Sequence, residues 1–315
     1  MIRIGLLSTA DIHRAHLAAV AETSPVVAVA SRTPAKAEAF ARAHGIERVH
    51  ASYEELLADP ELDAVVIALP NALHHEWSMR ALAEGKHVLC EKPYTRHPEE
   101  AEVAWDAAER RGLVLMEGFM WRHAPQTALM LELLPQLGTL YSIHATFSFR
   151  FERPDTDVRL VPALGGGSLL DVGSYCVSAL RLVAGEPDEA YGTRVLGRGG
   201  VDWGFAGVLC SGDVLGTFQC GFRHDERSIV VRGAGGELRA PDPWHASESR
   251  IYLNGEEHLV EPEDPYRRQL ANFVSAIEGD AEPLLGRDDA LGQARALDAL
   301  DTAAASGRAV SLATA

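Results

Sequence analysis

The chain has 315 residues, 47% hydrophobic and 23% charged, which is typical of a folded globular protein with two domains or one large domain. Lys and Arg number 29 against 45 Asp and Glu, and the formal net charge of −16 disfavours a nucleic-acid partner. The four cysteines form no C-x-x-C pair, which disfavours a zinc knuckle or a disulfide framework. No apolar run approaches the roughly 18 residues of a membrane helix, so we expect no membrane partner.

Residues 1–118 alternate short apolar segments with helical ones. Strands are expected at Ile2–Leu7, Val26–Ala30, Ala64–Leu69, His87–Cys90 and Leu113–Met116, and helices at Ile12–Glu22, Pro34–Ala43, Tyr53–Ala58, Ala72–Glu84 and Pro98–Arg111. Ser52 and Glu55 form a capping box at one helix start. Five strands alternating with helices predict an α/β domain with a doubly wound parallel sheet of the Rossmann type.

Residues 119–315 differ, because longer alternating segments and hairpin signals dominate. Strands are expected at Thr139–Phe151, Val201–Leu209 and Val214–Phe222, and helices at Ser168–Ala184, Tyr266–Glu278 and Asp289–Ala305. This pattern predicts an α+β domain built on a large, open, mostly antiparallel sheet. The free face of such a sheet needs a cover, so we expect a homodimer, or a dimer of dimers, formed through it.

The first strand–helix turn is a candidate dinucleotide site. It retains one of the usual glycines, and small residues stand at two later positions, so backbone N–H groups can approach a pyrophosphate. An ordinary tight turn explains the segment about as well. The candidate cofactor-binding residues of this turn are Gly5, Ser8, Thr9, Ala10, Asp11 and Ile12.

The end of the second strand suggests which dinucleotide binds. No Asp or Glu stands there to bind a ribose 2′-hydroxyl, whereas Ser31 and Arg32, together with Lys36, could bind a 2′-phosphate. The alternative is a solvated arginine in a loop. We therefore expect NADP(H) as the preferred cofactor, with NAD(H) possible.

Two further loops follow strands at the edge where open α/β sheets bind ligands. One supplies the candidate cofactor residues Leu69, Pro70, Asn71 and His74, with His75 expected to be structural, and the other supplies Glu91 and Lys92. Lys92 follows an apolar strand directly, so we expect it near the crevice; the alternative is a structural ion pair with Glu91. Pro93 restricts Lys92, and the bond between them is a candidate for the cis form.

Asp171, Tyr175 and Ser178 share one face of a predicted helix that follows three glycines. A lysine cation near a phenol lowers the phenol's pKa from about 10 towards the range of acid–base catalysis. Gly173 is expected to leave room beside Tyr175 for a ligand. The alternative is that Tyr175 is an amphipathic core residue.

Weaker candidates lie elsewhere. Glu117 could line the crevice, and Trp121 either stacks on a sugar or fills the domain junction. His13 and His16 are three residues apart, but no third ligand accompanies them, so we expect a solvated helix face and no metal site.

The sequence resembles the glucose–fructose oxidoreductase/inositol dehydrogenase/rhizopine-catabolism (Gfo/Idh/MocA) family over essentially the whole chain. The resemblance is carried by Gly5, P-N-x-x-H at 70–74, E-K-P at 91–93 and G-G-G-S-L-L-D-V-G-S-Y at 165–175. The resemblance implies an NADP-binding domain at 1–118 and a substrate-binding, dimerising domain at 119–315. Tyr175 stands where most members have histidine, as in the branch of dihydrodiol and NADP-dependent xylose dehydrogenases and glucose–fructose oxidoreductase.

The resemblance implies an NAD(P)-dependent dehydrogenase or reductase acting on a sugar, cyclitol or related diol or ketone. Lys92 matches the catalytic lysine and Asp171 the substrate-binding aspartate, with Tyr175 as acid and base and Trp121 and Arg122 as further candidate substrate contacts. Two alternatives are a redox-assisted glycosidase or lyase with tightly bound NAD, and an inactive NADP-binding sensor. The N-terminus lacks a secretory signal, so we expect a cytoplasmic protein.

Overall fold

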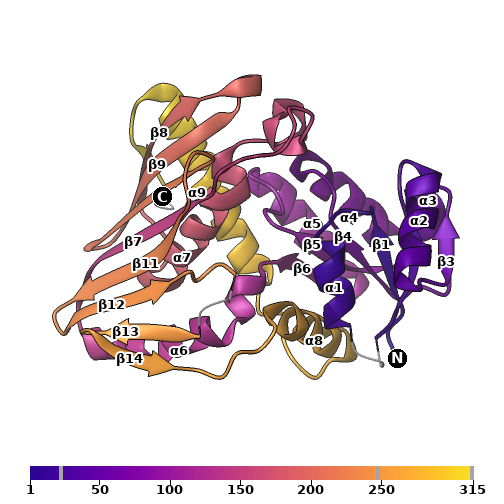
Figure 1. Cartoon of the computed structure of the whole chain (residues 1–315), viewed down its shortest axis with the longest axis horizontal. Helices are drawn as coiled ribbons and strands as arrows, with labels where there is room; N and C mark the ends of the chain where they lie inside the picture. Colours follow the sequence, from indigo (N-terminus) through magenta and orange to yellow (C-terminus); the bar gives the residue numbers. More distant parts are fainter. Residues whose placement is uncertain (21–23, 246–248, 313–315) are drawn as a thin grey trace. The chain divides into compact units, whose positions relative to one another are not determined.

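The computed structural model describes residues 1–20, 24–245 and 249–312, which group into two compact units (Figure 1). The first unit consists of Met1–Thr95, Glu99–Met120 and Tyr266–Ala290, and the second of Arg96–Pro98, Trp121–Pro265 and Leu291–Ala315. The first unit thus includes a segment, 266–290, that lies far along the chain from its other parts. Among the described residues, no helix is long and apolar enough to cross a membrane.

The first unit contains a six-stranded parallel sheet in the order β3-β2-β1-β4-β5-β6. Its strands are β1 (Ile4–Leu7), β2 (Val26–Ala30), β3 (Arg48–His50), β4 (Ala64–Ile67), β5 (His87–Glu91) and β6 (Leu115–Gly118). This confirms the expected doubly wound sheet, but β3 is a strand that the sequence did not reveal. It has three residues, two of them charged or polar and none fully buried, so no apolar segment signals it.

The helices of this unit are α1 (His13–Ala19), α2 (Pro34–His44), α3 (Tyr53–Leu57), α4 (His74–Ala83), α5 (Pro98–Arg111) and α8 (Pro265–Glu278). The expected cap at α3 is formed by Ser52, whose Oγ accepts from the Glu55 N–H (3.1 Å), but Glu55 Oε2 accepts from the N–H of Ala51 (3.0 Å), one residue before the position that a capping box uses. The expected end of the first helix, Glu22, lies outside the described residues.

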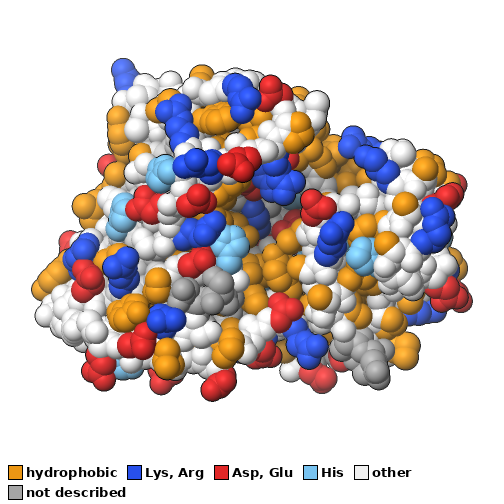
Figure 2. Space-filling view, in the orientation of Figure 1, with side chains coloured by type: hydrophobic (Ala, Val, Ile, Leu, Met, Phe, Trp, Pro, Cys, Tyr) orange, Lys and Arg blue, Asp and Glu red, His pale blue; other side chains and the backbone are white. Residues whose placement is uncertain are grey.

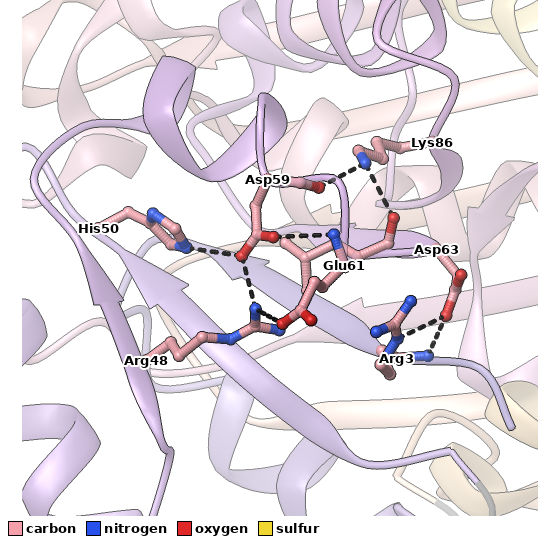
Figure 3. Close-up of polar contacts among 8 residues, drawn as sticks. Arg3, Arg48, His50, Asp59, Glu61, Asp63 and Lys86 are labelled. Carbon is pink, nitrogen blue, oxygen red and sulfur yellow. Dashed lines mark hydrogen bonds and ion pairs between the residues drawn. The ribbon is translucent and has the colours of Figure 1, made fainter.

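A polar network joins the amino-terminal edge of this sheet (Figure 3). The buried Lys86 donates from Nζ to the carbonyl oxygens of Asp59 (2.7 Å) and Leu62 (2.8 Å). Burial lowers the pKa of Lys86, and the nearby carboxylates of Asp59 and Asp63 oppose that shift. Arg48 contacts the Asp59 carboxylate at 3.0 Å. These charges therefore stabilise the amino-terminal edge of the sheet. Ligands of open α/β sheets bind at the other edge, at the carboxyl ends of the strands.

The second unit contains a nine-stranded sheet in the order β14-β13-β12-β11-β7-β10-β9-β8-β15. Its strands are β7 (Leu140–Ser148), β8 (Glu189–Leu196), β9 (Asp202–Ser211), β10 (Val214–Gly221), β11 (Glu226–Gly233), β12 (Gly236–Pro241), β13 (Arg250–Leu253), β14 (Glu256–Leu259) and β15 (Val310–Ser311). Among the strand pairs of the described residues in this sheet, only β7–β10 is parallel. The prediction of an open, mostly antiparallel sheet is therefore confirmed.

Helices α6 (Pro125–Leu133), α7 (Ser174–Ala184) and α9 (Arg287–Ser306) cover one face of this sheet (Figure 1). Glycines let them approach closely: a Cβ at Gly216 would lie 2.9 Å from Leu180 of α7, and one at Gly207 would lie 2.9 Å from Leu300 of α9. The opposite face of the sheet carries the residues that alternate with these along each strand. Charged side chains of both signs are interspersed on the surface seen in Figure 2.

Candidate active site

The turn after β1 places a serine where the backbone favours glycine. Ser8 has φ 109°, a conformation that costs a non-glycine residue about 1–3 kcal/mol. Its hydroxyl offsets this cost by donating to the Ala68 carbonyl (2.8 Å) and accepting from the Ala10 N–H (3.2 Å). A Cβ at Gly5 would lie 2.9 Å from the Leu56 side chain, so this glycine lets α3 pack on β1. The turn is therefore formed without the usual second and third glycines.

His13 and His16 contradict the sequence expectation of a solvated helix face, because their exposed fractions are 0% and 1%. The His16 ring packs edge-on against Tyr266 at 5.6 Å between centroids. Tyr266 lies on α8, and it stands 250 residues after His16 in the chain. The sequence pattern around α1 therefore could not show that α8 would cover its histidines.

The end of β2 combines a buried serine with exposed basic side chains. Ser31 is buried and its hydroxyl accepts from the Thr33 N–H at 3.4 Å. Arg32 is exposed and hydrogen-bonds Tyr53, which opposes the rise that burial causes in the pKa of that phenol. Lys36 is exposed in the first turn of α2. Residues 31–36 contain no acidic side chain, so this tip fits a 2′-phosphate.

His74 connects the two loops that follow β4 and β5. Its Nε2 lies 2.8 Å from the Leu69 carbonyl oxygen and its Nδ1 lies 2.8 Å from that of Pro93. Burial lowers the pKa of His74, whereas the two carbonyls and Glu91 oppose that shift. Both ring nitrogens thus lie against backbone carbonyl oxygens, and the cofactor contact that the sequence analysis expects of His74 stays a prediction.

The segment Glu91-Lys92-Pro93 leaves β5 with both Glu91 and Lys92 half-buried. The Lys92–Pro93 bond is cis, as the sequence had suggested. Glu117 is buried and its Oε1 accepts from the Tyr94 N–H at 2.8 Å, so Glu117 secures the backbone after this segment. Leu69 is buried, and Pro70 and Asn71 are half-buried at the neighbouring loop.

In the second unit, a π-helical turn, Leu169–Gly173, precedes α7 where the sequence predicted one regular helix. The Asp202 carboxylate holds the start of this turn by accepting from Ser168 Oγ (2.6 Å) and the Leu169 N–H (2.7 Å). Gly173 does not leave room for a ligand, since a Cβ there would lie 2.9 Å from Cys220 Sγ. The space at Gly173 is filled by Cys220 of β10.

Asp171 is paired with an arginine that sequence reasoning missed. Arg159 Nε donates to Asp171 Oδ2 at 2.7 Å, and this carboxylate is the main cause of the raised pKa of Arg159. Arg159 also contacts Asp157 at 3.3 Å. The arginine stands twelve residues before Asp171 in a short 3-10 helix, Val158–Leu160, a separation at which neither helix nor strand periodicity predicts contact.

Tyr175 belongs to an aromatic cluster that the sequence did not reveal. Its ring lies 5.2 Å from Phe147 and 5.8 Å from Trp244, measured between centroids. Trp244 in turn lies 5.3 Å from Trp121, whose exposed fraction is 0%. The half-buried Arg122 donates to Ser178 Oγ at 3.4 Å, and Ser178 lies three residues after Tyr175 on α7. Trp121 thus packs within this unit.

Family models match both parts of the chain. Residues 2–119 match the model described as an oxidoreductase family with an NAD-binding Rossmann fold, and residues 135–239 match the C-terminal domain of the same family. The chain belongs to the Gfo/Idh/MocA family. Compared with D-xylose 1-dehydrogenase (NADP(+)) 2 of Haloferax volcanii, it is 38% identical over 98% of this chain and 99% of that protein.

Other members of the family are similar over most of their length. A 3-ketoreductase from Actinomadura kijaniata, solved with NADP and TDP-benzene, has a TM-score of 0.89 and 32% identity over 96% of this chain and 97% of that one. The scyllo-inositol 2-dehydrogenase (NADP(+)) of Bacillus subtilis is 29% identical over 86% of this chain and 93% of that protein.

Membership of the family confirms the enzyme class expected from the motifs. This Gfo/Idh/MocA chain is an NADP-dependent dehydrogenase or reductase of CH–OH or keto groups, and the similar proteins from Haloferax volcanii and Bacillus subtilis are dehydrogenases of a sugar and a cyclitol. The basic tip of β2 fits that cofactor. Within the described part of the chain, no group of three or more His, Cys, Asp or Glu is arranged to hold a metal ion.

Proposed function

We propose that the enzyme interconverts a sugar or related polyol and its ketone or lactone, with Tyr175 as the acid–base residue and Lys92 as the residue that orients the substrate oxygen. The observation that carries this proposal is the arrangement around Tyr175. Its phenol stands four residues after the Arg159-bound Asp171 and is framed by the rings of Phe147 and Trp244. An aromatic frame with a carboxylate suits the apolar face and hydroxyl groups of a sugar.

NADPH, when bound, supplies the hydride for reduction. Tyr175 would donate its phenolic proton to the substrate oxygen in that direction and accept it in the other. The Lys92 ammonium would hydrogen-bond the same oxygen and stabilise the negative charge that develops on it. Asp171, fixed by Arg159, would accept a hydrogen bond from a second substrate hydroxyl. This second contact favours polyols over simple alcohols.

The cofactor assignments follow from the loops at the carboxyl edge of the six-stranded sheet. The Ser8–Ile12 turn would hold the pyrophosphate with backbone N–H groups, and Ser31, Arg32 and Lys36 would bind the 2′-phosphate. Leu69, Pro70, Asn71, Glu91 and Lys92 would line the nicotinamide side. Solved variants of the 3-ketoreductase, with a tyrosine changed to phenylalanine or a lysine changed to alanine, are consistent with a Tyr–Lys pair as the focus of this chemistry.

We further propose that two copies associate through the uncovered face of the nine-stranded sheet. One row across this face contains Tyr191, Val208, Thr217, His144 and Val230, which pair in register on neighbouring strands. Tyr191 is 43% exposed, and Leu215 on the next row is 48% exposed. Burying such a surface against a second copy would remove apolar area from water. A cytoplasmic location stays a prediction.

A substrate panel tests the proposal directly. Aldoses, cyclitols, trans-diols and keto-sugars are each incubated with NADP(H) and with NAD(H), and the change in reduced-cofactor absorbance is followed. We expect turnover with at least one polyol or keto-sugar, faster with NADP(H). Release of an elimination or hydrolysis product, with no net oxidation or reduction of the cofactor, would contradict the proposal.

A further inference from the structure

A pocket of the second unit lies outside the residues that the proposed chemistry uses. Its volume is about 410 Å³, and it is lined by Gly197, Arg198, Trp203, Phe222 and Arg223. Small-molecule sites have volumes of about 300–1,000 Å³, so the pocket is large enough for part of a substrate. Among the described residues that line it, two are arginines and none is acidic, although the whole chain has a formal net charge of −16. The lining therefore favours an anionic ligand.

The aromatic wall of the pocket is fixed by contacts within the second unit. Phe222 is buried, and its ring centroid lies 6.2 Å from that of Trp203. The Phe151 ring packs against both, at 5.5 Å from Phe222 and 5.9 Å from Trp203. Trp203 Nε1 donates to the Arg198 carbonyl oxygen at 3.3 Å, and a Cβ at Gly197 would overlap the indole ring. These contacts provide a preformed apolar surface for the carbon skeleton of a ligand.

The two arginines supply hydrogen-bond donors beside this surface. Arg198 Cζ lies 5.0 Å from the centroid of the Trp203 ring, and Arg198 Nη1 lies 2.6 Å from Asp155 Oδ1. Arginine has five N–H donors, so this ion pair leaves donors for a ligand. The Arg223 side chain is exposed and has neither a hydrogen bond nor an ion pair with another described residue. Two guanidinium groups at one pocket match the oxygens of a phosphate or a carboxylate.

The start of β9 connects the pocket to the proposed substrate-binding aspartate. Trp203 follows Asp202, whose carboxylate accepts from Ser168 Oγ (2.6 Å) and the Leu169 N–H (2.7 Å). Leu169 begins the π turn that carries Asp171. One strand end therefore supports both the indole of the pocket and the turn with the aspartate.

A second connection involves the 3-10 helix that carries Arg159. Arg159 binds Asp171 at 2.7 Å and is followed by Leu160. A Cβ at Gly199 would overlap the Leu160 carbonyl oxygen, so this glycine lets the segment after Arg198 lie against that helix. The pocket thus adjoins, on two sides, the residues that hold Asp171.

The chain also limits how far the pocket lies from Tyr175. The Phe147 ring packs against Tyr175 at 5.2 Å, and the Phe151 ring packs against Trp203 at 5.9 Å. Phe151 stands four residues after Phe147, and four residues of extended chain span at most about 14 Å. A sugar ring beside Tyr175 and a charged group attached to that ring can therefore be bound at the two places at once.

We propose that this pocket binds an anionic substituent of the substrate, a phosphate or a carboxylate group. The proposal rests on the proposed function, because it extends the same substrate beyond Asp171. Arg198 and Arg223 would donate to the oxygens of the anion, and Trp203 would pack against the adjoining carbon atoms. The contact determines which substrate binds and takes no part in the transfer of the proton or the hydride.

Fluorine NMR of the full-length enzyme tests the pocket without any turnover. The five tryptophans are labelled as 5-fluorotryptophan, and the Trp203 signal is assigned with Trp203→Phe. The probes are glucose 6-phosphate, glucuronate and glucose. We expect the anionic probes to shift the Trp203 signal and glucose at the same concentration to leave it unchanged. The affinities of the two anions distinguish a phosphate ester from a carboxylate as the preferred group.

Arginine variants show whether the two guanidinium groups bind the anion. Arg198→Gln and Arg223→Gln should each weaken anion binding about 10-fold or more, as the loss of a charge-assisted hydrogen bond would. Arg295→Gln, at an exposed arginine of α9, is the matched control and should leave the affinity unchanged. The inference is overturned if neither anion shifts the Trp203 signal, if glucose shifts it equally, or if either variant keeps full affinity.

Kinetics separates this inference from the proposed function. The polyol or keto-sugar found in the substrate panel is compared with its phosphate ester and its carboxylate analogue. In Arg223→Gln, the ratio of kcat/KM for the anionic compound to that for the neutral one should fall about 10-fold or more, and in Arg295→Gln it should not change. An unchanged ratio in Arg223→Gln overturns the pocket and leaves the proposed function standing. If no compound is turned over, the proposed function fails, and the NMR titration still decides whether the pocket binds an anion.

Discussion

At the scale of single residues, we propose that the specificity of this enzyme for its cofactor depends on the tip of β2. Arg32 is exposed and hydrogen-bonds Tyr53, and no carboxylate accompanies it between residues 31 and 36. A guanidinium matches phosphate oxygens in geometry and charge, and a carboxylate at this position would repel them. The sequence alone predicted this feature, because it depends on residue types beside a strand that was itself easy to identify.

We expect Arg32→Ala to weaken NADPH binding about 10- to 100-fold, as the loss of a charge-assisted contact would, and to leave NADH binding nearly unchanged. Titration of cofactor fluorescence measures both constants. Arg42→Ala removes an exposed arginine of the same helix, α2, and serves as the control. Equal loss of affinity for NADPH and NADH would show that Arg32 does not contact the 2′-phosphate.

At the scale of elements, the start of α7 is stabilised by a contact that no local pattern signals. Gly167 has φ 119°, and a Cβ there would lie 2.1 Å from Asp202 Oδ1, the carboxylate that holds Ser168 and Leu169. The sequence predicted a glycine-led helix with Asp171 and Tyr175 on it. It could not predict the π turn, because that turn depends on Asp202 of a strand far along the chain.

The same limit explains the other differences. Lys92, Asp171 and Tyr175 could be named as candidate site residues because each stands in a recognisable local motif, and their roles stay predictions. Arg159, Phe147 and Trp244 were not, since each reaches Asp171 or Tyr175 only through tertiary packing. His13 and His16 were assigned to solvent for the same reason: the helix that covers them, α8, comes from late in the chain.

We expect Gly167→Ala to lower the free energy of unfolding by at least about 3 kcal/mol, because it combines backbone strain with a clash against a carboxylate. Gly212→Ala is the matched control. Gly212 also has a positive φ, 54°, but nothing lies within 4 Å of a Cβ there, so its cost should be about 1–2 kcal/mol. Denaturant unfolding compares the two, and equal losses would show that the Asp202 contact is unimportant.

At the scale of the whole molecule, the nine-stranded sheet is the feature through which we expect two copies of the chain to associate. Helices α6, α7 and α9 cover one face, whereas residues such as Val208 and Thr217 line the other. A broad sheet face with this mixture of small and apolar side chains is the surface on which we expect a second copy to pack.

Val208→Arg should shift the enzyme from dimer to monomer, because it places a charge in the middle of that face. Light scattering coupled to size exclusion, at micromolar concentrations, measures the mass. Leu131→Arg adds the same charge to an exposed position on α6 and should leave the mass unchanged. A monomeric unmodified enzyme, or an unchanged mass in Val208→Arg, would exclude this interface.

Steady-state turnover of Tyr175→Phe tests the central claim most directly. The phenyl ring keeps the contacts to Phe147 and Trp244, so we expect NADPH affinity to be unchanged while kcat falls at least about 100-fold. Lys92→Met should show a similar loss of kcat, and Tyr141→Phe, at an exposed tyrosine of β7, should show none. Full turnover in both Tyr175→Phe and Lys92→Met would contradict the assignment of these two residues to catalysis.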